Sequence, residues 1–363
     1  MNFEACDHSR LAALAAAFAD ANGAPGFEDA VHAVARPVLE RCGTVTEDKM
    51  RNLYCYRAEN TGTRPVVQLD AHMDEVGFMV HSICPNGTLR FITLGGWVAN
   101  NIPAHTVRVQ SKHGDWVLGV VASKPPHFMS AAERSQPASV EDMVIDIGAR
   151  SAEEAKNEFG IRIGAPVVPD VTTSYDAEHD LLVGKAFDCR LGCTAIVEAL
   201  RRLRGKELAV DVVAALSTQE EMGTRGAAVT ANTVKPDVAI VLEGCPCDDT
   251  FLPADRSQTR LKEGPYLRHI DQRMLTHPRF QRLALDLAEQ YGIPVQEGVR
   301  TGGSTNGAPI HLAGQGVPTI DIGVPVRYIH THYGVASCAD VEHSVQLTMA
   351  LLTELTPECI DRL

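Results

Sequence analysis

The sequence has no long apolar run and few aromatic residues. No segment approaches the roughly 20 apolar residues that a membrane-spanning helix needs, so we expect no membrane span. Aromatic residues make up 5% of the chain, with two tryptophans, which argues against a sugar groove lined by aromatic platforms. Lys and Arg number 33 against 46 Asp and Glu, which gives a net charge of −13. Without a basic patch, nucleic acid is not an expected partner.

Signals for export and for disulfide bonding are also missing. Glu4 and Asp7 precede the alanine-rich stretch Leu11 to Ala19, where a signal peptide would carry basic residues. Asp7 is better explained as the N-cap of a helix. The ten cysteines are scattered and lack the dense, even spacing of a secreted disulfide scaffold. The sequence therefore predicts reduced thiols in a cytoplasmic protein.

The chain does contain short apolar strands that alternate with amphipathic helices. Apolar, β-branched runs predict buried strands at 66–69, 209–216, 237–242 and 317–324. Helical periodicity predicts helices at 190–204, 279–291 and 339–353. This alternation predicts an α/β fold in which helices flank both faces of a mostly parallel sheet.

One segment interrupts this alternation. Between about residues 77 and 175 the sequence has short β-like pieces at 78–83, 106–110 and 116–121, separated by turn signals. Helical periodicity is scarce there. We therefore predict a small β-rich domain, residues 77–175, inserted into an α/β domain formed by residues 1–76 and 176–363.

The first chemical motif follows the strand 66–69. If the chain stays extended, His72 and Asp74 lie on the same face of it, because side chains alternate with a period of two. The Asp74 carboxylate can then accept the second imidazole N–H, which fixes the His72 ring as a metal ligand. The alternative is a polar loop with two surface residues.

The second motif is the pair Glu220-Glu221, which follows the strand 209–216 and precedes Gly223. Adjacent glutamates on a loop usually serve only solubility. At the carboxyl end of a strand, however, one carboxylate can bind a metal while its neighbour takes a proton from water.

Three further residues complete a candidate metal-binding set. Asp188 stands just ahead of a helix, where an N-cap is the alternative; Glu243 stands at the tip of the strand 237–242, and His330 follows the strand 317–324. Open α/β sheets build their sites at the carboxyl ends of parallel strands. Two imidazoles and three carboxylates at that edge can hold two divalent metals. The spacing therefore predicts a two-metal hydrolase.

Together these motifs resemble the tetrahedral-type co-catalytic metallo-aminopeptidases, a family that includes glutamyl, leucyl and deblocking aminopeptidases and some members labelled endoglucanase. The resemblance covers most of the chain. Besides the motifs above, it includes Lys-Pro-Pro-His at 124–127, Asp-Ile-Gly-Ala at 146–149, Gly-Gly-Ser-Thr at 302–305 and Arg-Tyr-Ile-His at 327–330. It implies the fold of the co-catalytic zinc exopeptidases.

The resemblance also implies which residue binds which metal. Asp188 would bridge the two ions, with His72 and Glu243 completing one site and Glu221 and His330 the other. Because two imidazoles are present, the ligands suit zinc or cobalt better than magnesium.

The resemblance further implies an aminopeptidase that removes N-terminal residues from short peptides. Glu220 would be the general base and Asp74 the partner of His72. The bond between Asp188 and Cys189 would be cis. The β-rich insertion would be a dimerisation domain, and the dimers would assemble into a homo-dodecamer.

Three residues depart from the family pattern. Cys189 stands where a second aspartate is usual, so we expect a hydrogen bond beside the metal ligands to be missing. Many members carry aspartate in place of Glu243, whose longer side chain would change the geometry or metal preference of its site. Asn306 stands where an aspartate is common, so we expect a charge to be absent near the substrate pocket.

Two alternatives to the aminopeptidase remain. A metal-binding, self-assembling protein without catalysis would account for the three departures, although the presence of Glu220 argues against it. A glycoside hydrolase would need two carboxylates that flank a sugar and no paired metals.

Overall fold

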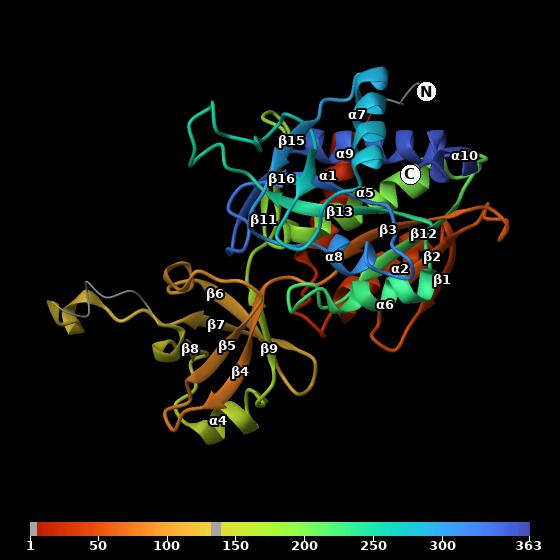
Figure 1. Cartoon of the computed structure of the whole chain (residues 1–363). Coiled ribbons are helices and arrows are strands. Elements are labelled where there is room, and N and C mark those ends of the chain that lie inside the picture. Colours follow the sequence, from red (N-terminus) through yellow and green to blue (C-terminus); the bar gives the residue numbers. More distant parts are fainter. Residues whose placement is uncertain (1–5, 132–138) are drawn as a thin grey trace.

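The main domain is built on a mixed sheet. The computed structural model describes residues 6–131 and 139–363, so Glu4 lies outside the described residues. Within these ranges eight strands form one sheet in the order β1-β2-β12-β3-β13-β16-β14-β15 (Figure 1). Their bounds are β1 Gly43–Glu47, β2 Leu53–Arg57, β3 Val66–His72, β12 Asp211–Ser217, β13 Val238–Pro246, β14 Tyr266–Ile270, β15 Gln296–Val299 and β16 Thr319–Val326.

The centre of this sheet is parallel, and its edges are not. The four predicted strands are β3, β12, β13 and β16, and they pair in parallel as neighbours. β2 joins β12 antiparallel, and β14 joins β16 antiparallel. In the parallel register Ser217 lies beside His72, and Glu243 lies beside Gly323. The predicted α/β fold is confirmed, and the antiparallel edge strands were not predicted.

Helices cover the faces of the sheet (Figure 1). Their bounds are α1 His8–Asp20, α2 Asp29–Leu39, α5 Phe187–Leu203, α6 Arg225–Val234, α7 Pro278–Tyr291, α8 Gly307–Ile310, α9 Cys338–Glu354 and α10 Pro357–Ile360. The three predicted helices correspond to α5, α7 and α9. Asp7 caps α1 by accepting from the Arg10 backbone N–H at 3.1 Å, as predicted. Among the described residues, no helix has the length and apolar character to cross a membrane.

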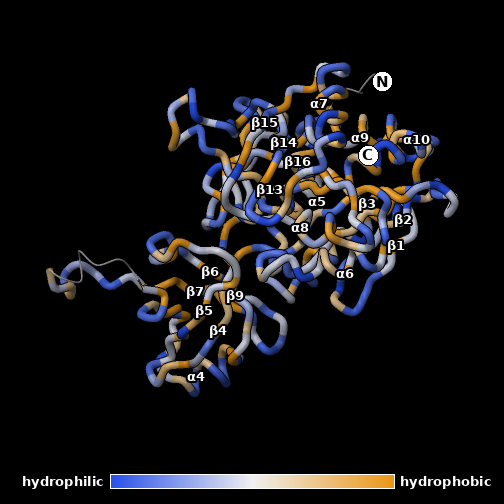
Figure 2. Tube along the Cα trace, viewed as in Figure 1, coloured by the Kyte–Doolittle hydropathy of each residue, from blue (hydrophilic) through white to orange (hydrophobic). Residues whose placement is uncertain are grey.

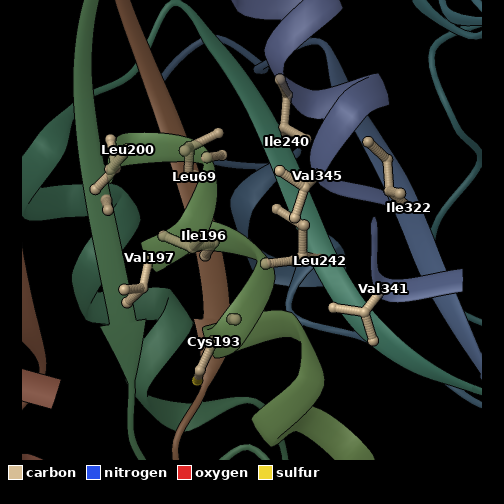
Figure 3. Close-up of a cluster of buried hydrophobic side chains, with 14 of the residues drawn as sticks. Leu69, Cys193, Ile196, Val197, Leu200, Ile240, Leu242, Ile322, Val341 and Val345 are labelled. Carbon is tan, nitrogen blue, oxygen red and sulfur yellow. The ribbon is translucent and has the colours of Figure 1, made fainter. Parts of the chain in front are cut away.

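The core lies between the sheet and the helices α5 and α9. In Figure 3, Ile196 and Leu200 of α5 face Leu69 of β3, and Val345 of α9 lies near Leu242 of β13. All five side chains are at most 1% exposed. Full burial of one such side chain contributes about 1.5–3 kcal/mol, so this contact fixes α5, and with it the residues at its start, against the sheet.

A closed barrel forms the second domain, and Figure 1 shows it standing apart from the main sheet. Its strands are β4 Gly77–Ile83, β5 Leu89–Leu94, β6 Thr106–Gln110, β7 Trp116–Val121, β8 Ile145–Asp146 and β9 Pro166–Pro169, with the helix α4 Ala152–Asn157 at one end. The three predicted β-like pieces are β4, β6 and β7. The barrel has its own apolar interior, which includes Phe78, Phe91 and Val107, and Figure 2 shows hydrophobic residues in orange along its strands.

A small antiparallel sheet is formed by β10 Ser174–Asp176 and β11 Leu181–Gly184, which follow the barrel along the chain, and by β17 Gly334–Ala336, which follows β16. It brings the chain back from the barrel into α5. Its strand β17 closes the loop that follows β16, because Arg327 and Val335 exchange backbone hydrogen bonds of 2.9 and 3.2 Å.

Candidate metal centre

His72 is the last residue of β3, and its side chain is 1% exposed. Its Nε2 lies 3.2 Å from Asp188 Oδ1 and 3.0 Å from Glu243 Oε1. On the opposite edge of the ring, Nδ1 lies 3.1 Å from the Asp74 carbonyl oxygen and 3.4 Å from Asp74 Oδ1. Burial lowers the pKa of His72, but Glu243, Asp188 and Asp74 outweigh burial and raise it well above its usual value.

Asp188 lies between two histidines. Its Oδ1 faces His72, and its Oδ2 lies 3.3 Å from His330 Nε2. Burial alone would raise the pKa of Asp188, but hydrogen bonds from His330 and His72 hold it well below its usual range. The Asp188–Cys189 bond is cis, as the resemblance implied. The prediction that Asp188 follows a parallel strand is wrong, because β11 belongs to the small antiparallel sheet.

Glu243 lies inside β13, not at its tip. The strand was predicted to end at residue 242, but β13 continues to Pro246 because its parallel pairing with β16 reaches Val326. The Glu243 side chain is 6% exposed. A Cβ on the following Gly244 would lie 2.7 Å from the Asp188 Cα, so only glycine allows β13 to approach Asp188 this closely.

The pair Glu220-Glu221 follows β12 on a loop that Asp74 holds. The Asp74 carboxylate accepts the backbone N–H groups of Glu220 at 2.8 Å and Glu221 at 3.0 Å. Glu221 Oε1 lies 3.6 Å from His330 Nε2, and Glu220 Oε2 lies 4.0 Å from His72 Nε2. Burial, together with the neighbouring carboxylates, raises the pKa of each of the two glutamates to about 8.

His330 lies on the loop after β16, and its ring contacts the barrel domain. Its Nδ1 lies 3.0 Å from the carbonyl oxygen of Gly96, which can therefore accept the ring N–H. Burial lowers the pKa of His330, but Glu221 and Asp188 raise it to about 10. The contact with Gly96 could not be predicted, because a backbone carbonyl carries no residue signature and Gly96 lies 234 positions away along the chain.

The structure brings all seven predicted site residues together. Two groups with ligand atoms within 4.8 Å of one another share Asp188: one adds His72 and Glu243, the other Glu221 and His330. Glu243 Oε2 and Glu221 Oε1 are buried without a hydrogen-bond partner among the described residues. Buried carboxylate oxygens need a partner, so the residues of these two groups fit metal ligation.

Cys189 falls within the first of these groups, but its thiol has another role. Its Sγ donates a hydrogen bond to the Leu242 carbonyl oxygen at 2.9 Å. Burial and the nearby Glu243 raise the pKa of this thiol well above its usual value. Because this hydrogen bond already engages the thiol, Cys189 is not assigned as a ligand. The thiol makes a buried hydrogen bond at the position where the family usually has an aspartate.

A groove of about 490 Å³ opens beside the cluster. Glu220, Glu243 and His330 line one side of it. Further lining comes from the barrel loop at 96–98 and from Pro246, Arg268, Arg300 and residues 302–305. The two arginines and the barrel loop could not be predicted as part of the site, because no local pattern links them to the metal-binding motifs.

Asn306 does not line this groove, although the preceding residue, Thr305, does. Its side chain is fully buried and donates to Asp70 Oδ1 and to Ser217 Oγ, both at 2.7 Å. An amide suits this position because it donates to a carboxylate, where an aspartate would face Asp70 with a like charge. The departure at Asn306 therefore changes a buried polar network beneath the sheet.

Comparisons with known proteins agree with this geometry. A protein-family model described as M42 glutamyl aminopeptidase matches residues 52–347. The chain is 33% identical over 335 residues to the glutamyl aminopeptidase of Lactococcus lactis subsp. cremoris, covering 92% of this chain and 93% of that protein.

Two solved structures match almost the whole chain. The TET aminopeptidase of the Thaumarchaeota archaeon SCGC AB-539-E09 superposes with a TM-score of 0.93 at 36% identity, over 97% of this chain and 99% of that one. The TET1 peptidase of Pyrococcus horikoshii, which can assemble into a tetrahedron or a large octahedral shell, gives a TM-score of 0.85 at 27% identity, over 95% of this chain and 100% of that one. The chain belongs to the M42 glutamyl aminopeptidase family and is a hydrolase of the exopeptidase class.

Proposed function

We propose that this chain is a two-metal aminopeptidase that removes N-terminal residues from short peptides. The observation that carries the proposal is the position of Asp188 between His72 and His330, with each oxygen of its carboxylate facing one imidazole. This arrangement lets one carboxylate serve two cations at once. The alternative of a glycoside hydrolase does not account for two imidazoles at the centre of the site.

In this proposal one ion is held by His72, Asp188 and Glu243, and the other by Asp188, Glu221 and His330. Two imidazoles among these ligands favour zinc or cobalt. When bound, the pair would supply Lewis acidity, which polarises the scissile carbonyl and makes water a better acid.

Glu220 is proposed as the general base. It lines the groove, belongs to neither of the two groups that share Asp188, and has its backbone held by Asp74. Its carboxylate would accept a proton from water as the water oxygen attacks the first peptide carbonyl carbon. It would then deliver that proton to the leaving amine nitrogen.

We further propose that residues 77–175 form a dimerisation domain and that dimers build a homo-dodecamer. Leu118 and Val120 lie two residues apart on β7 and so on the same face of the strand, and they are 58% and 42% exposed; exposed apolar side chains that gather on one face mark interaction surfaces. The shell assembled by the Pyrococcus horikoshii peptidase supports this proposal. All ten cysteines are free thiols, which fits the expected cytoplasmic location.

The catalytic proposal is tested with metal-free protein reconstituted with Zn²⁺ or Co²⁺. Bound metal is measured by atomic emission, and release of amino acids is followed on short peptides and across a series of aminoacyl substrates. We expect two equivalents of metal per chain and hydrolysis only after reconstitution. Glu220→Gln should keep both metals and lower turnover by roughly 10²- to 10⁴-fold. Glu158→Gln, at an exposed barrel position, is the matched control and should behave like the wild type.

Each alternative predicts a different result. Two bound metals without amino-acid release would favour the inactive self-assembling protein. Sugar release from cellulose that persists in a chelator would favour the glycoside hydrolase. Near-wild-type hydrolysis by Glu220→Gln would remove Glu220 from the role of base.

The assembly proposal is tested by light scattering. Leu118→Asp should yield monomers, because it places a charge on the proposed dimer surface. Leu312→Asp changes a leucine of the main domain that is 72% exposed and should leave dimers intact. Dimers that persist in Leu118→Asp would contradict this choice of surface.

A further inference from the structure

The end of strand β5 in the barrel runs directly against the metal centre. A Cβ on Gly95 would lie 2.7 Å from Val76 Cγ1 and 3.0 Å from Glu221 Oε2, so this position has no room for a side chain. The next residue, Gly96, offers its carbonyl oxygen to His330 Nδ1 at 3.0 Å. The backbone of the barrel therefore contacts both Glu221 and His330.

A small apolar cluster fastens the loop that carries Glu221 to the barrel. Met222, the residue after Glu221, packs against a cluster of Ala24, Leu94 and Val168. Leu94 and Val168 are barrel residues, and both are at most 4% exposed. Through Met222 the Glu220-Glu221 loop therefore packs against the barrel.

His332 fastens the loop that carries His330 in the same way. It is 1% exposed, and its ring stacks on His105 of the barrel with centroids 3.9 Å apart and an interplanar angle of 11°. The edge of Trp97 meets it at 5.0 Å and 60°. Trp97 in turn stacks on Phe78 of the barrel interior at 4.6 Å and 28°. Rings therefore run without interruption from the barrel core to the His330 loop.

The ring of His332 holds the His330 loop mainly by aromatic stacking rather than by hydrogen bonds. Neither of its nitrogens has a partner in hydrogen-bond geometry among the described residues, although the Asn101 backbone lies near one of them. Stacked rings are worth about 0.5–1.5 kcal/mol beyond the area that they bury. A phenylalanine at this position would keep most of that contribution.

The His330 loop needs such support. Tyr328 and His330 both have φ of +60°, a left-handed conformation that costs non-glycine residues about 1–3 kcal/mol unless the surroundings hold it. Neither belongs to a strand of the main sheet. His72 and Glu243, in contrast, lie on strands of the main sheet, where His72 pairs with Ser217 of β12 and Glu243 pairs with Gly323 of β16.

We propose that the barrel domain positions the metal ligands Glu221 and His330, and that His332 is the main positioning residue through its stack on His105. The proposal rests on the two-metal function proposed above. It predicts that the two metal equivalents respond differently when the contact between the domains is weakened. Only the equivalent held by Glu221 and His330 depends on the barrel.

The test is a titration of metal-free full-length protein with Co²⁺, followed by calorimetry and by visible absorption, with a chelator as competitor. His332→Ala should weaken one equivalent by about 10- to 100-fold, the usual effect of losing a group that supports a ligand, and leave the other within about twofold. His330→Ala identifies the affected equivalent, and the double variant should lose no further affinity there.

Three further variants make the test specific. His332→Phe should bind both equivalents like the wild type, because it keeps the stack. His105→Ala should reproduce His332→Ala from the barrel side. His113→Ala changes an exposed barrel histidine and should have no effect. The Phe and His105 variants also keep the test informative if His332→Ala folds poorly.

The results separate this proposal from the function on which it rests. Equal weakening of both equivalents in His332→Ala, no weakening in either, or a His332→Phe variant as weak as His332→Ala would each overturn the positioning role. A wild-type protein that binds fewer than two equivalents would contradict the metal centre itself, and the positioning role with it.

Discussion

The two halves of the metal centre are held by different means. His72 and Glu243 lie on the central strands β3 and β13, and their side chains are 1% and 6% exposed. Glu221 and His330 lie on loops that pack against the barrel, and the His330 side chain is 37% exposed. A ligand within a strand is positioned by the pairing of that strand in the sheet, whereas a loop ligand needs a second surface. In this chain another domain supplies that surface.

The largest difference between the two halves should appear in the stability of the metal-free protein. In the metal-free protein the imidazolium of His72 pairs with the buried carboxylates of Asp188 and Glu243. His72→Ala removes this pairing, so we expect the free energy of unfolding to fall by about 3–5 kcal/mol. His330→Ala removes a more exposed partner and should cost about 1 kcal/mol or less. Urea unfolding of both variants without metal checks this. Equal losses would show that the sheet-held half is no more constrained than the loop-held half.

Asp74 connects the two halves, and its replacement should have the next largest effect. Its carboxylate holds the backbone of Glu220 and Glu221 and faces His72. Asp74→Asn keeps the shape but leaves a single acceptor oxygen, so we expect turnover to fall by about 10- to 100-fold while two metals stay bound.

Metal analysis and peptide hydrolysis on the same sample measure both quantities. Asp146→Asn is the matched control, since Asp146 is exposed and also accepts a backbone N–H, from Gly148. Loss of a metal from Asp74→Asn, rather than loss of turnover alone, would show that Asp74 acts on a ligand more than on the base.

A third prediction compares how the metal affinity of each half responds when its glutamate ligand is shortened to aspartate. Glu243→Asp withdraws the carboxylate by one methylene, about 1.5 Å, from a position where Oε1 lies 3.0 Å from His72 Nε2. The rigid strand cannot follow, so the affinity of the sheet-held equivalent should fall by about tenfold. Glu221→Asp should have a smaller effect on the other equivalent, because its loop can move. Cobalt titration of both variants measures the difference, and the opposite order would contradict the contrast in rigidity.

The smallest effect is expected at Cys189. A serine hydroxyl can donate to the Leu242 carbonyl as the thiol does, so Cys189→Ser should change the free energy of unfolding by about 1 kcal/mol or less and leave turnover within about twofold. Cys359→Ser, in the terminal helix α10, is the control. A large loss of activity in Cys189→Ser alone would show that the thiol does more than fill this buried position.

The sequence was most informative where a local pattern carries the structure. The four central strands and the helices α5, α7 and α9 follow from apolar periodicity, because each is buried along one face or on all sides. His72, Glu220 and Glu221 could be placed beside one another because parallel strands bring their carboxyl ends to one edge. The strands β2 and β14, which flank the parallel centre and pair antiparallel with it, were missed, since this pairing follows from the finished sheet.

The sequence was least informative where two distant segments meet. Gly96 and His330 are 234 positions apart, and no spacing rule connects them. From the resemblance, Asn306 was expected to leave a charge missing near the substrate pocket, and its side chain lies in the buried polar network of Asp70. Which side of the chain a loop residue faces depends on the packed structure, and the sequence pattern does not contain it.

The glycine pair at 95 and 96 also limits how this architecture can be rebuilt. A barrel grafted from another member of the family could differ in its strands, turns and outer surface without harm to the site. It would still have to place glycines at positions 95 and 96 beside Glu221 and His330, and an aromatic ring at position 97 beside His332. The inserted barrel can therefore vary except at the residues that contact the metal centre. Whether a chimera binds metal should depend on these few contact positions rather than on overall sequence similarity.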